Sequence, residues 1–218
     1  MKRFVIIGLG NFGAGLAETL YRHGHDVLAI DQSEAAVDRI APLVTRAAVG
    51  DGRQREALER LGAKECDAGI VSTGDDITAS ILATLALRDL DAASIYVKVI
   101  SRDHARVMTR MGVTETIFPE REAALNLGTR LSSASVFNYI SIGAGFGIQE
   151  MIVPDTWEGH TLRELDIRRQ HQISVVAVHD VLRDRMQVPP DPDAPLLQSE
   201  TLLVAGREED LERLGQMK

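Results

Sequence analysis

The stretch Phe4–Gly13 reads FVIIGLGNFG, and this run sets the fold class of the first half of the chain. Its apolar residues 4–7 have the composition of a buried parallel strand, and the segment after it has the apolar spacing of a helix. The glycines therefore lie at a turn from strand to helix. Gly8 permits the tight turn, Gly10 lets a phosphate approach the backbone, and Gly13 lets helix and strand pack closely.

A second apolar strand, Val27–Ile30, ends at an acidic residue, Asp31. A carboxylate at this place can accept hydrogen bonds from both hydroxyls of an adenosine ribose. Gln32 and Ser33 follow it, so no neighbouring arginine or lysine receives a 2′-phosphate. Because free N–H groups at the start of the first helix face an anion, the pattern predicts a site for a nucleotide with an unphosphorylated ribose. NADP is disfavoured.

Strand-like and helix-like segments alternate through the first 120 residues. Strands are expected near Val5 and at residues 27–30, 44–49, 68–72, 95–99 and 115–118. This alternation predicts an α/β fold with a Rossmann-like, doubly wound parallel sheet, whose ligands lie beyond the carboxyl ends of the strands. The residues expected at that edge, besides the glycine loop, are Asp31, Gly50, Asp51, Ser72, Thr73, Gly74, Asp75, Lys98, Pro119 and Glu120.

The remainder of the chain differs in composition. A helix is expected after Pro119, and residues 143–147 read GAGFG, which precedes a strand candidate and is interpreted as a linker. A short helix at 162–165, strands at 148–153, 173–178 and 202–205, and a proline-rich turn at 189–195 predict a small α+β module. We therefore expect three parts: a nucleotide-binding domain over 1–120, a helix and linker over 121–140, and an α+β domain over 141–218.

Composition excludes several classes of protein. The chain has 24 basic and 32 acidic residues among 218, and no basic cluster stands out, so a nucleic-acid partner is not expected. Its single cysteine, Cys66, excludes an internal disulfide and is expected to pack in the core. No apolar run approaches the ~20 residues of a membrane helix. A cytoplasmic protein is expected.

Four motifs, in this order and spacing, resemble the regulatory subunits of bacterial potassium uptake systems of the KtrA and TrkA type. These subunits are built from RCK domains, which regulate potassium conductance. The motifs are VIIGLGNFG at 5–13, HGHDVLAID at 23–31, IYVKV at 95–99 and FPERE at 118–122. The resemblance continues through 136–140, 162–168 and 202–206, so it covers nearly the whole chain.

The resemblance implies a nucleotide-binding RCK N-terminal domain and a small RCK C-terminal domain. A crossover helix would be exchanged between the two protomers of a homodimer, and dimers would form an octameric ring. The partner would be a KtrB- or TrkH-type membrane subunit that translocates potassium, so the chain would lie at the inner face of the cell membrane without entering it. It would be a nucleotide sensor and not an enzyme, with no catalytic residue.

The same resemblance implies roles for the edge residues. The phosphates would lie on Gly8, Gly10, Asn11 and Gly13, the ribose on Asp31, and the base near Asp51, with Ser72–Asp75 bordering the pocket. Phe12 and Gln32 are further candidate residues of the nucleotide site. Lys98 resembles a basic residue near the phosphates, with a solvent-exposed strand-end lysine as the alternative. Glu120 resembles an acidic residue associated with Mg²⁺ or another divalent cation, although a glutamate at a helix start is also what the helix dipole favours.

One departure leaves the ligand open. Related chains usually carry arginine where this one has Asn11, and an amide brings no charge to a terminal phosphate. ADP, ATP, NAD and NADH therefore all stay candidates. Cyclic di-AMP at the C-terminal domain is a further one, with Arg168, Ile173 and residues 189–195 as its possible contacts. The alternative functions are an NAD-dependent oxidoreductase and an RCK-type regulator of another channel or antiporter.

Overall fold

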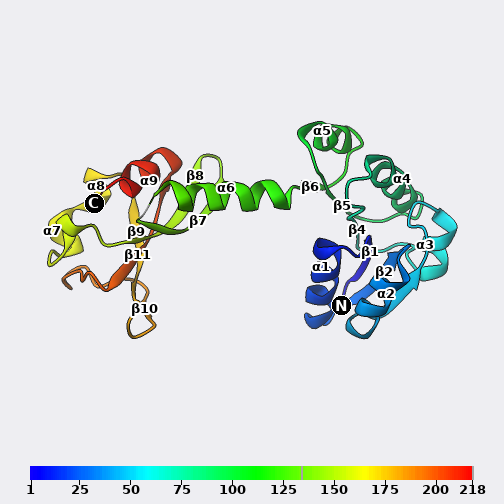
Figure 1. Cartoon of the computed structure of the whole chain (residues 1–218), viewed down its shortest axis with the longest axis horizontal. Coiled ribbons are helices and arrows are strands. Elements are labelled where there is room, and N and C mark those ends of the chain that lie inside the picture. Colours follow the sequence, from blue (N-terminus) through cyan, green and yellow to red (C-terminus); the bar gives the residue numbers. More distant parts are fainter. Residues whose placement is uncertain (134, 218) are drawn as a thin grey trace. The chain divides into compact units, whose positions relative to one another are not determined.

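The computed structural model describes residues 1–133 and 135–217, and the chain divides into two compact units, Met1–Glu120 and Arg121–Lys218. Figure 1 colours the first unit from blue to green and the second from green to red. Residue 134, inside the linker expected from the sequence, and residue 218 lie outside the described residues. Within the described ranges, no helix is long and apolar enough to cross a membrane.

The first unit contains a parallel sheet of six strands in the order β3-β2-β1-β4-β5-β6. The strands are β1 (Arg3–Ile7), β2 (Asp26–Asp31), β3 (Arg46–Val49), β4 (Ala68–Val71), β5 (Ile95–Lys98) and β6 (Glu115–Ile117). The reversal of strand order between β1 and β4 marks a doubly wound sheet, so the predicted Rossmann-like fold is confirmed.

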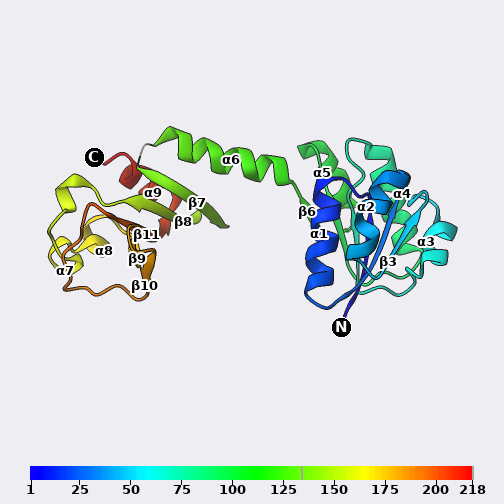
Figure 2. The same ribbon diagram turned by 60° about the horizontal axis from the view of Figure 1, so that its bottom comes forward.

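Helices cover both faces of this sheet, as Figure 2 shows. They are α1 (Asn11–Arg22), α2 (Glu34–Ile40), the 3₁₀ turn η1 (Ala41–Leu43), α3 (Arg55–Leu61), α4 (Ile77–Arg88) and α5 (Arg102–Arg110). Ser33, Asp76 and Ser101 accept hydrogen bonds from the first turns of α2, α4 and α5. These caps lie in the loops that follow β2, β4 and β5, at the carboxyl edge of the sheet, and they satisfy N–H groups of the first helical turns.

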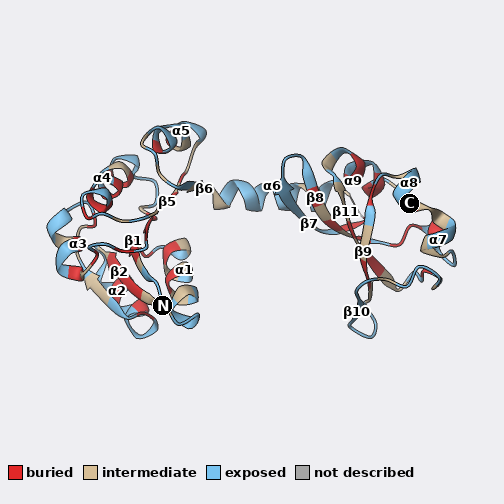
Figure 3. Ribbon diagram, turned by 180° about the vertical axis from the view of Figure 1, so that it is seen from behind, coloured by how far each residue is buried: buried red, intermediate tan, exposed pale blue. Residues whose placement is uncertain are grey.

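Two apolar clusters lie on the two faces, because successive strand residues point to opposite sides. Val5 and Ile7 of β1 pack in the cluster that α3, α4 and α5 cover. Ile6, between them, packs with α1 and α2. Cys66 is fully buried in the first cluster, which confirms its packing role, and Figure 3 shows much of β1 and β2 as buried.

The second unit contains an antiparallel sheet of five strands in the order β10-β9-β11-β8-β7. Its strands are β7 (Val136–Gly143), β8 (Phe146–Ile152), β9 (Ser174–Asp180), β10 (Arg185–Gln187) and β11 (Glu200–Arg207). Its helices are α6 (Pro119–Ser132), which begins in the first unit, the 3₁₀ turn η2 (Asp155–Trp157), α7 (Leu162–Leu165), α8 (Ile167–Gln170) and α9 (Glu208–Gly215). The predicted α+β class is confirmed.

The prediction of a linker at residues 143–147 is wrong. Gly143, Ala144 and Gly145 all have positive φ, and they form the tight turn of a hairpin that joins β7 to β8. Such a turn needs residues that adopt the left-handed region, and glycine does so without steric cost. Residues 136–140, also assigned to a linker from the sequence, form the start of β7 because they pair with β8.

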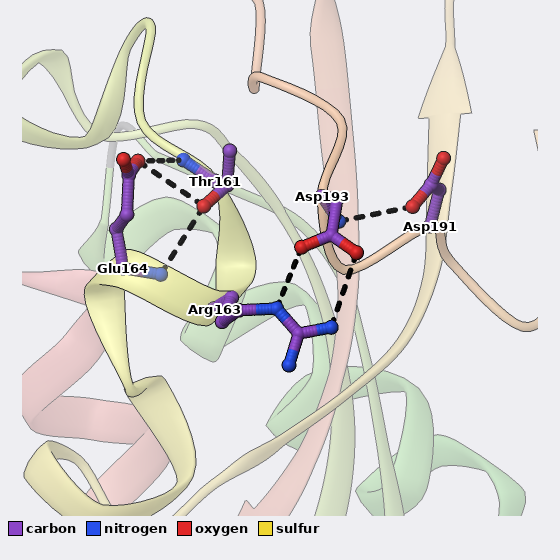
Figure 4. Close-up of polar contacts among 5 residues, drawn as sticks. All are labelled: Thr161, Arg163, Glu164, Asp191 and Asp193. Atoms are coloured by element: carbon purple, nitrogen blue, oxygen red, sulfur yellow. Dashed lines mark hydrogen bonds and ion pairs between the residues drawn. The ribbon is translucent and has the colours of Figure 1, made fainter.

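Polar contacts hold the proline-rich segment against the short helix α7 (Figure 4). Thr161 and Glu164 form a capping box, in which each side chain accepts the other residue's backbone N–H, at 3.1 and 2.9 Å. Arg163 donates from Nε and Nη2 to the two carboxylate oxygens of Asp193, at 2.6 and 3.1 Å. Asp193 in turn donates its backbone N–H to the carboxylate of Asp191 at 2.9 Å. These hydrogen bonds fix the proline-rich segment against α7.

Replacing Gly8 by alanine should destabilise the chain. A Cβ at Gly8 would lie 2.1 Å from the carbonyl oxygen of Ser72, and the backbone there has a φ of +93°. Left-handed strain and overpacking together should lower the free energy of unfolding by about 2–4 kcal/mol. Urea unfolding of the full chain, followed by circular dichroism, measures this.

Gly15→Ala is the matched control for that substitution. Gly15 lies inside α1, and a Cβ there meets no atom within 4 Å. Alanine is the better helix former, so this variant should be more stable than the parent by about 0.5–1 kcal/mol. Equal urea midpoints for Gly8→Ala and the parent would contradict the close backbone contact.

Candidate nucleotide site

The glycine loop lies at the centre of the carboxyl edge, after β1. Gly8 donates its N–H to the carbonyl of Ile30 at 2.9 Å, and a Cβ on Gly13 would lie 2.0 Å from the carbonyl oxygen of Gly8. Gly10 is the N-cap of α1 and brings no side chain to the N–H groups of the first turn. Those groups have no intrahelical acceptor, and together with the helix dipole they favour an anion.

Asp31 is fixed against this loop. Its Oδ2 accepts the backbone N–H of Leu9 at 2.6 Å, and its Oδ1 accepts the N–H of Ser33 at 2.8 Å. Each carboxylate oxygen can accept two hydrogen bonds, so each one keeps an acceptor position. The carboxylate is thus oriented by the backbone and still able to take two hydroxyl donors.

The loop after β3 carries a cation, Arg53, that we did not predict from the sequence. Arg53 donates from Nε to Oδ1 of Asp51 at 2.8 Å and from Nη2 to Oδ2 at 2.7 Å. The Arg53 hydrogen bonds hold the pKa of Asp51 below its ordinary value, although burial opposes this. The spacing of an aspartate and an arginine two residues apart after a strand was the available signal. Spacing alone does not show whether two such side chains point toward each other, so the pair was not predicted.

Lys98 and Glu120 form an ion pair at the other end of the edge. The Nζ of Lys98 lies 2.6 Å from Oε1 of Glu120, and the lysine side chain is only 15% exposed, so it is not the solvated strand-end lysine. The hydrogen bond from Lys98 lowers the pKa of Glu120. Lys98 is the last residue of β5, and Glu120 lies in the first turn of α6.

The surroundings of Glu120 do not fit a divalent cation in the single chain. The ammonium group of Lys98 lies within hydrogen-bonding distance of its carboxylate, and a cation there would meet that charge. Over residues 1–133 and 135–217, no group of three His, Cys, Asp or Glu side chains is placed to hold a metal ion. No step of the function below is assigned to a metal.

The remaining predicted residues are distributed along the same edge. Asn11 and Phe12 begin α1, and Gln32 follows β2 with an exposed side chain. After β4, Ser72 is buried and donates its N–H to the carbonyl of Ile7 at 2.7 Å. Residues 73–75 lead into α4, and Asp76 caps this helix, since its Oδ1 accepts the N–H of Ala79 at 2.8 Å.

The cyclic di-AMP candidates of the second unit differ in exposure and in their contacts. Ile173 is 1% exposed and packs in the core against Gly206, so it is unavailable to a surface ligand. Arg168 is exposed on α8. The proline-rich segment is held by Arg163 through Asp193.

Comparison with known sequences identifies related proteins. The TrkA-N domain matches residues 4–119, and the TrkA-C domain matches residues 148–217. Over 212 residues, the chain is 29% identical to Ktr system potassium uptake protein A and 32% identical to Ktr system potassium uptake protein C, both from Bacillus subtilis. The alignments cover 97% of this chain and 95% of each relative.

Solved structures share the fold. The GsuK RCK domain superposes with a TM-score of 0.65 at 17% identity, over 99% of this chain and 47% of that one. The GsuK channel bound to NAD superposes with a TM-score of 0.53 at 22% identity, over 100% of this chain and 38% of that one. The GsuK structure bound to ADP superposes with a TM-score of 0.50 at 24% identity, over 60% of this chain and 34% of that one. The chain thus spans less than half the length of these proteins.

The Lys98–Glu120 pair should make stability depend on pH. A carboxyl whose pKa is lowered in the folded chain contributes stability above its unfolded pKa, about 4.3, and loses it as the pH falls through the folded pKa. Glu120→Gln should therefore cost less than about 1 kcal/mol at pH 7, since the glutamate is 60% exposed, and the cost should shrink as the pH falls below about 4.

Urea unfolding at a series of pH values measures that difference. Glu122→Gln, an exposed glutamate of the same helix, is the control and should show no such dependence. A difference between Glu120→Gln and the parent that is the same at pH 3 and pH 7 would contradict the pairing.

Proposed function

Since this chain belongs to the family of TrkA-N and TrkA-C domain proteins that includes the Ktr potassium uptake proteins, we propose that it is a nucleotide-sensing regulatory subunit of a potassium uptake system. The observation that carries the proposal is the geometry of one edge. A glycine loop at a helix start and an oriented aspartate lie side by side there, in a chain that matches these relatives over nearly its whole length. We propose binding and regulation, without catalysis.

The ligand that fits this edge is an adenine nucleotide. Its phosphates would accept N–H groups from Gly10, Asn11 and Gly13, and its ribose hydroxyls would donate to Asp31. Solved relatives of the same fold are bound to NAD and to ADP, which supports this ligand class. Because Asn11 carries no charge, a terminal phosphate gains no ionic contact from it. ADP, ATP, NAD and NADH are therefore all to be tested.

Lys98 supplies positive charge at the far side of the glycine loop. In the structure its ammonium is held by Glu120. We propose that an arriving phosphate shares this ammonium with Glu120, so that Glu120 is a positioning residue. The pre-set orientation lowers the entropy lost on binding.

Exposed apolar side chains on α6 support a homodimer. Within α6 no residue is buried, and Leu125, Leu127 and Leu131 are 60%, 50% and 78% exposed. A groove of about 650 Å³ lies beside this helix, with Tyr139 of β7 and Leu211 of α9 among its lining residues. Exposed apolar surface of this kind marks a site of interaction with another protein surface. We propose a second copy of the chain, with dimers assembled into an octameric ring.

The proposed ring would act on a KtrB- or TrkH-type membrane subunit from the cytoplasmic side. A bound nucleotide regulates the partner only if it binds two states of the ring with different affinity. A coupling free energy of about 1–3 kcal/mol is enough for a useful shift.

Calorimetry with ADP, ATP, NAD and NADH at millimolar concentration tests the first step. The full chain should bind at least one of them, and Asp31→Asn should weaken binding by about ten- to hundred-fold, because an amide offers one acceptor oxygen in place of two. Asp38→Asn, an exposed aspartate of α2, is the control and should bind as the parent does. Absence of binding of all four nucleotides would refute the proposal.

Potassium uptake tests the second step. Vesicles that contain the membrane subunit should take up potassium at a rate that depends on this chain and on the nucleotide, and Asp31→Asn should remove the nucleotide dependence. Production of NADH from a panel of hydroxy acids and amino acids would instead favour the oxidoreductase.

A further inference from the structure

The loop after β3 lies directly beside the ribose position of the proposed site. β3 pairs with β2, so Asp31 is opposite Val49, and Gly50 donates its N–H to the carbonyl of Asp31 at 2.8 Å. Gly52 then packs tightly, since a Cβ there would lie 2.3 Å from Cγ2 of Ile7. The loop is therefore held at the carboxyl edge of the sheet, against the ends of β2 and β1.

Arg53 leaves this loop in a fixed orientation. Its Nε and Nη2 donate to the two oxygens of Asp51, and its own backbone N–H also donates to Oδ1 at 3.0 Å. A two-point contact between a guanidinium and a carboxylate aligns their planes, which a single contact would not do. The side chain is still 38% exposed, compared with 20% for Asp51. The planar guanidinium is thus held through its Nε and Nη2 hydrogen bonds, and it remains accessible to solvent.

The direction in which a nucleotide extends follows from the fold. Phosphates at the start of α1 and a ribose at Asp31 define a path from β1 to β2, and the next strand along that path is β3. The base of such a ligand therefore reaches the loop at residues 50–53. A pinned guanidinium plane is well suited to stack on a purine ring, through both π-stacking and cation–π attraction.

We propose that Arg53 stacks on the adenine base of the nucleotide, and that Asp51 is the positioning residue that keeps the guanidinium flat. This inference rests on the proposed nucleotide site and names the group that reads its base. Oδ1 of Asp51 accepts the backbone N–H and the Nε–H of Arg53, and Oδ2 accepts the Nη2–H and shares the Nε–H at 3.0 Å. Both acceptor positions of each oxygen are taken, so contact with the base falls to the arginine. Binding would then depend on the base as well as on the phosphates.

Calorimetry of AMP and ADP with the full chain tests this role. Arg53→Ala should weaken both ligands by the same factor, about ten-fold, because the stacking contact is independent of the number of phosphates. Arg53→Lys should behave like Arg53→Ala, since it keeps the charge and loses the plane. Asp51→Asn should weaken binding less, because it loosens the guanidinium without removing it.

The controls separate three outcomes. Arg55→Ala makes the same charge change two residues away, at the exposed start of α3, and should bind as the parent does. A loss in Arg53→Ala that is larger for ADP than for AMP, or recovery in Arg53→Lys, would assign Arg53 to the phosphates and overturn the inference. Parent-like binding by Arg53→Ala would overturn it too, while failure of the parent to bind any nucleotide would refute the proposed site itself.

Discussion

The close contact of three backbone segments at the centre of the carboxyl edge is the constraint on which the candidate site depends. Gly8 lies against the carbonyl of Ser72, and Gly13 lies against the carbonyl of Gly8, with no room for a Cβ at either glycine. This contact brings the first turn of α1 onto the ends of β1 and β4, at the point where the strand order reverses. The free N–H groups of that turn are therefore presented beside Asp31, whose carboxylate accepts the N–H of Leu9.

Charged side chains along the edge are oriented before any ligand binds. Asp31 is held by backbone donors, Arg53 by the carboxylate of Asp51, and Lys98 by Glu120. Ion pairs of this exposure add little to stability. For the proposed nucleotide, their effect would be on binding, because side chains that are already ordered lose less conformational entropy when they contact a ligand. The second unit contributes a different surface, the exposed apolar side chains of α6.

Local patterns predicted the first unit well because each of its elements follows from short-range physics. Buried parallel strands are continuous apolar runs, and the glycine loop has few conformations open to it. The second unit was harder. The run at 143–147 resembles a linker in composition, and only the pairing of β7 with β8 shows that it is a hairpin turn. The strand β10 is short and exposed, so it lacks the apolar alternation that predicts a strand.

The sequence by itself determined the fold class and the family, and it predicted the candidate site, because the glycine loop, Asp31 and the alternation of strands and helices are local patterns along the chain. Tertiary structure alone decided which charges meet. Lys98 pairs with Glu120 because parallel strands bring separate loops to one edge. Arg53 turns back onto Asp51 because Gly52 packs on Ile7 and fixes the path of the loop. Such pairings depend on the route of the backbone in space, which spacing along the chain does not specify.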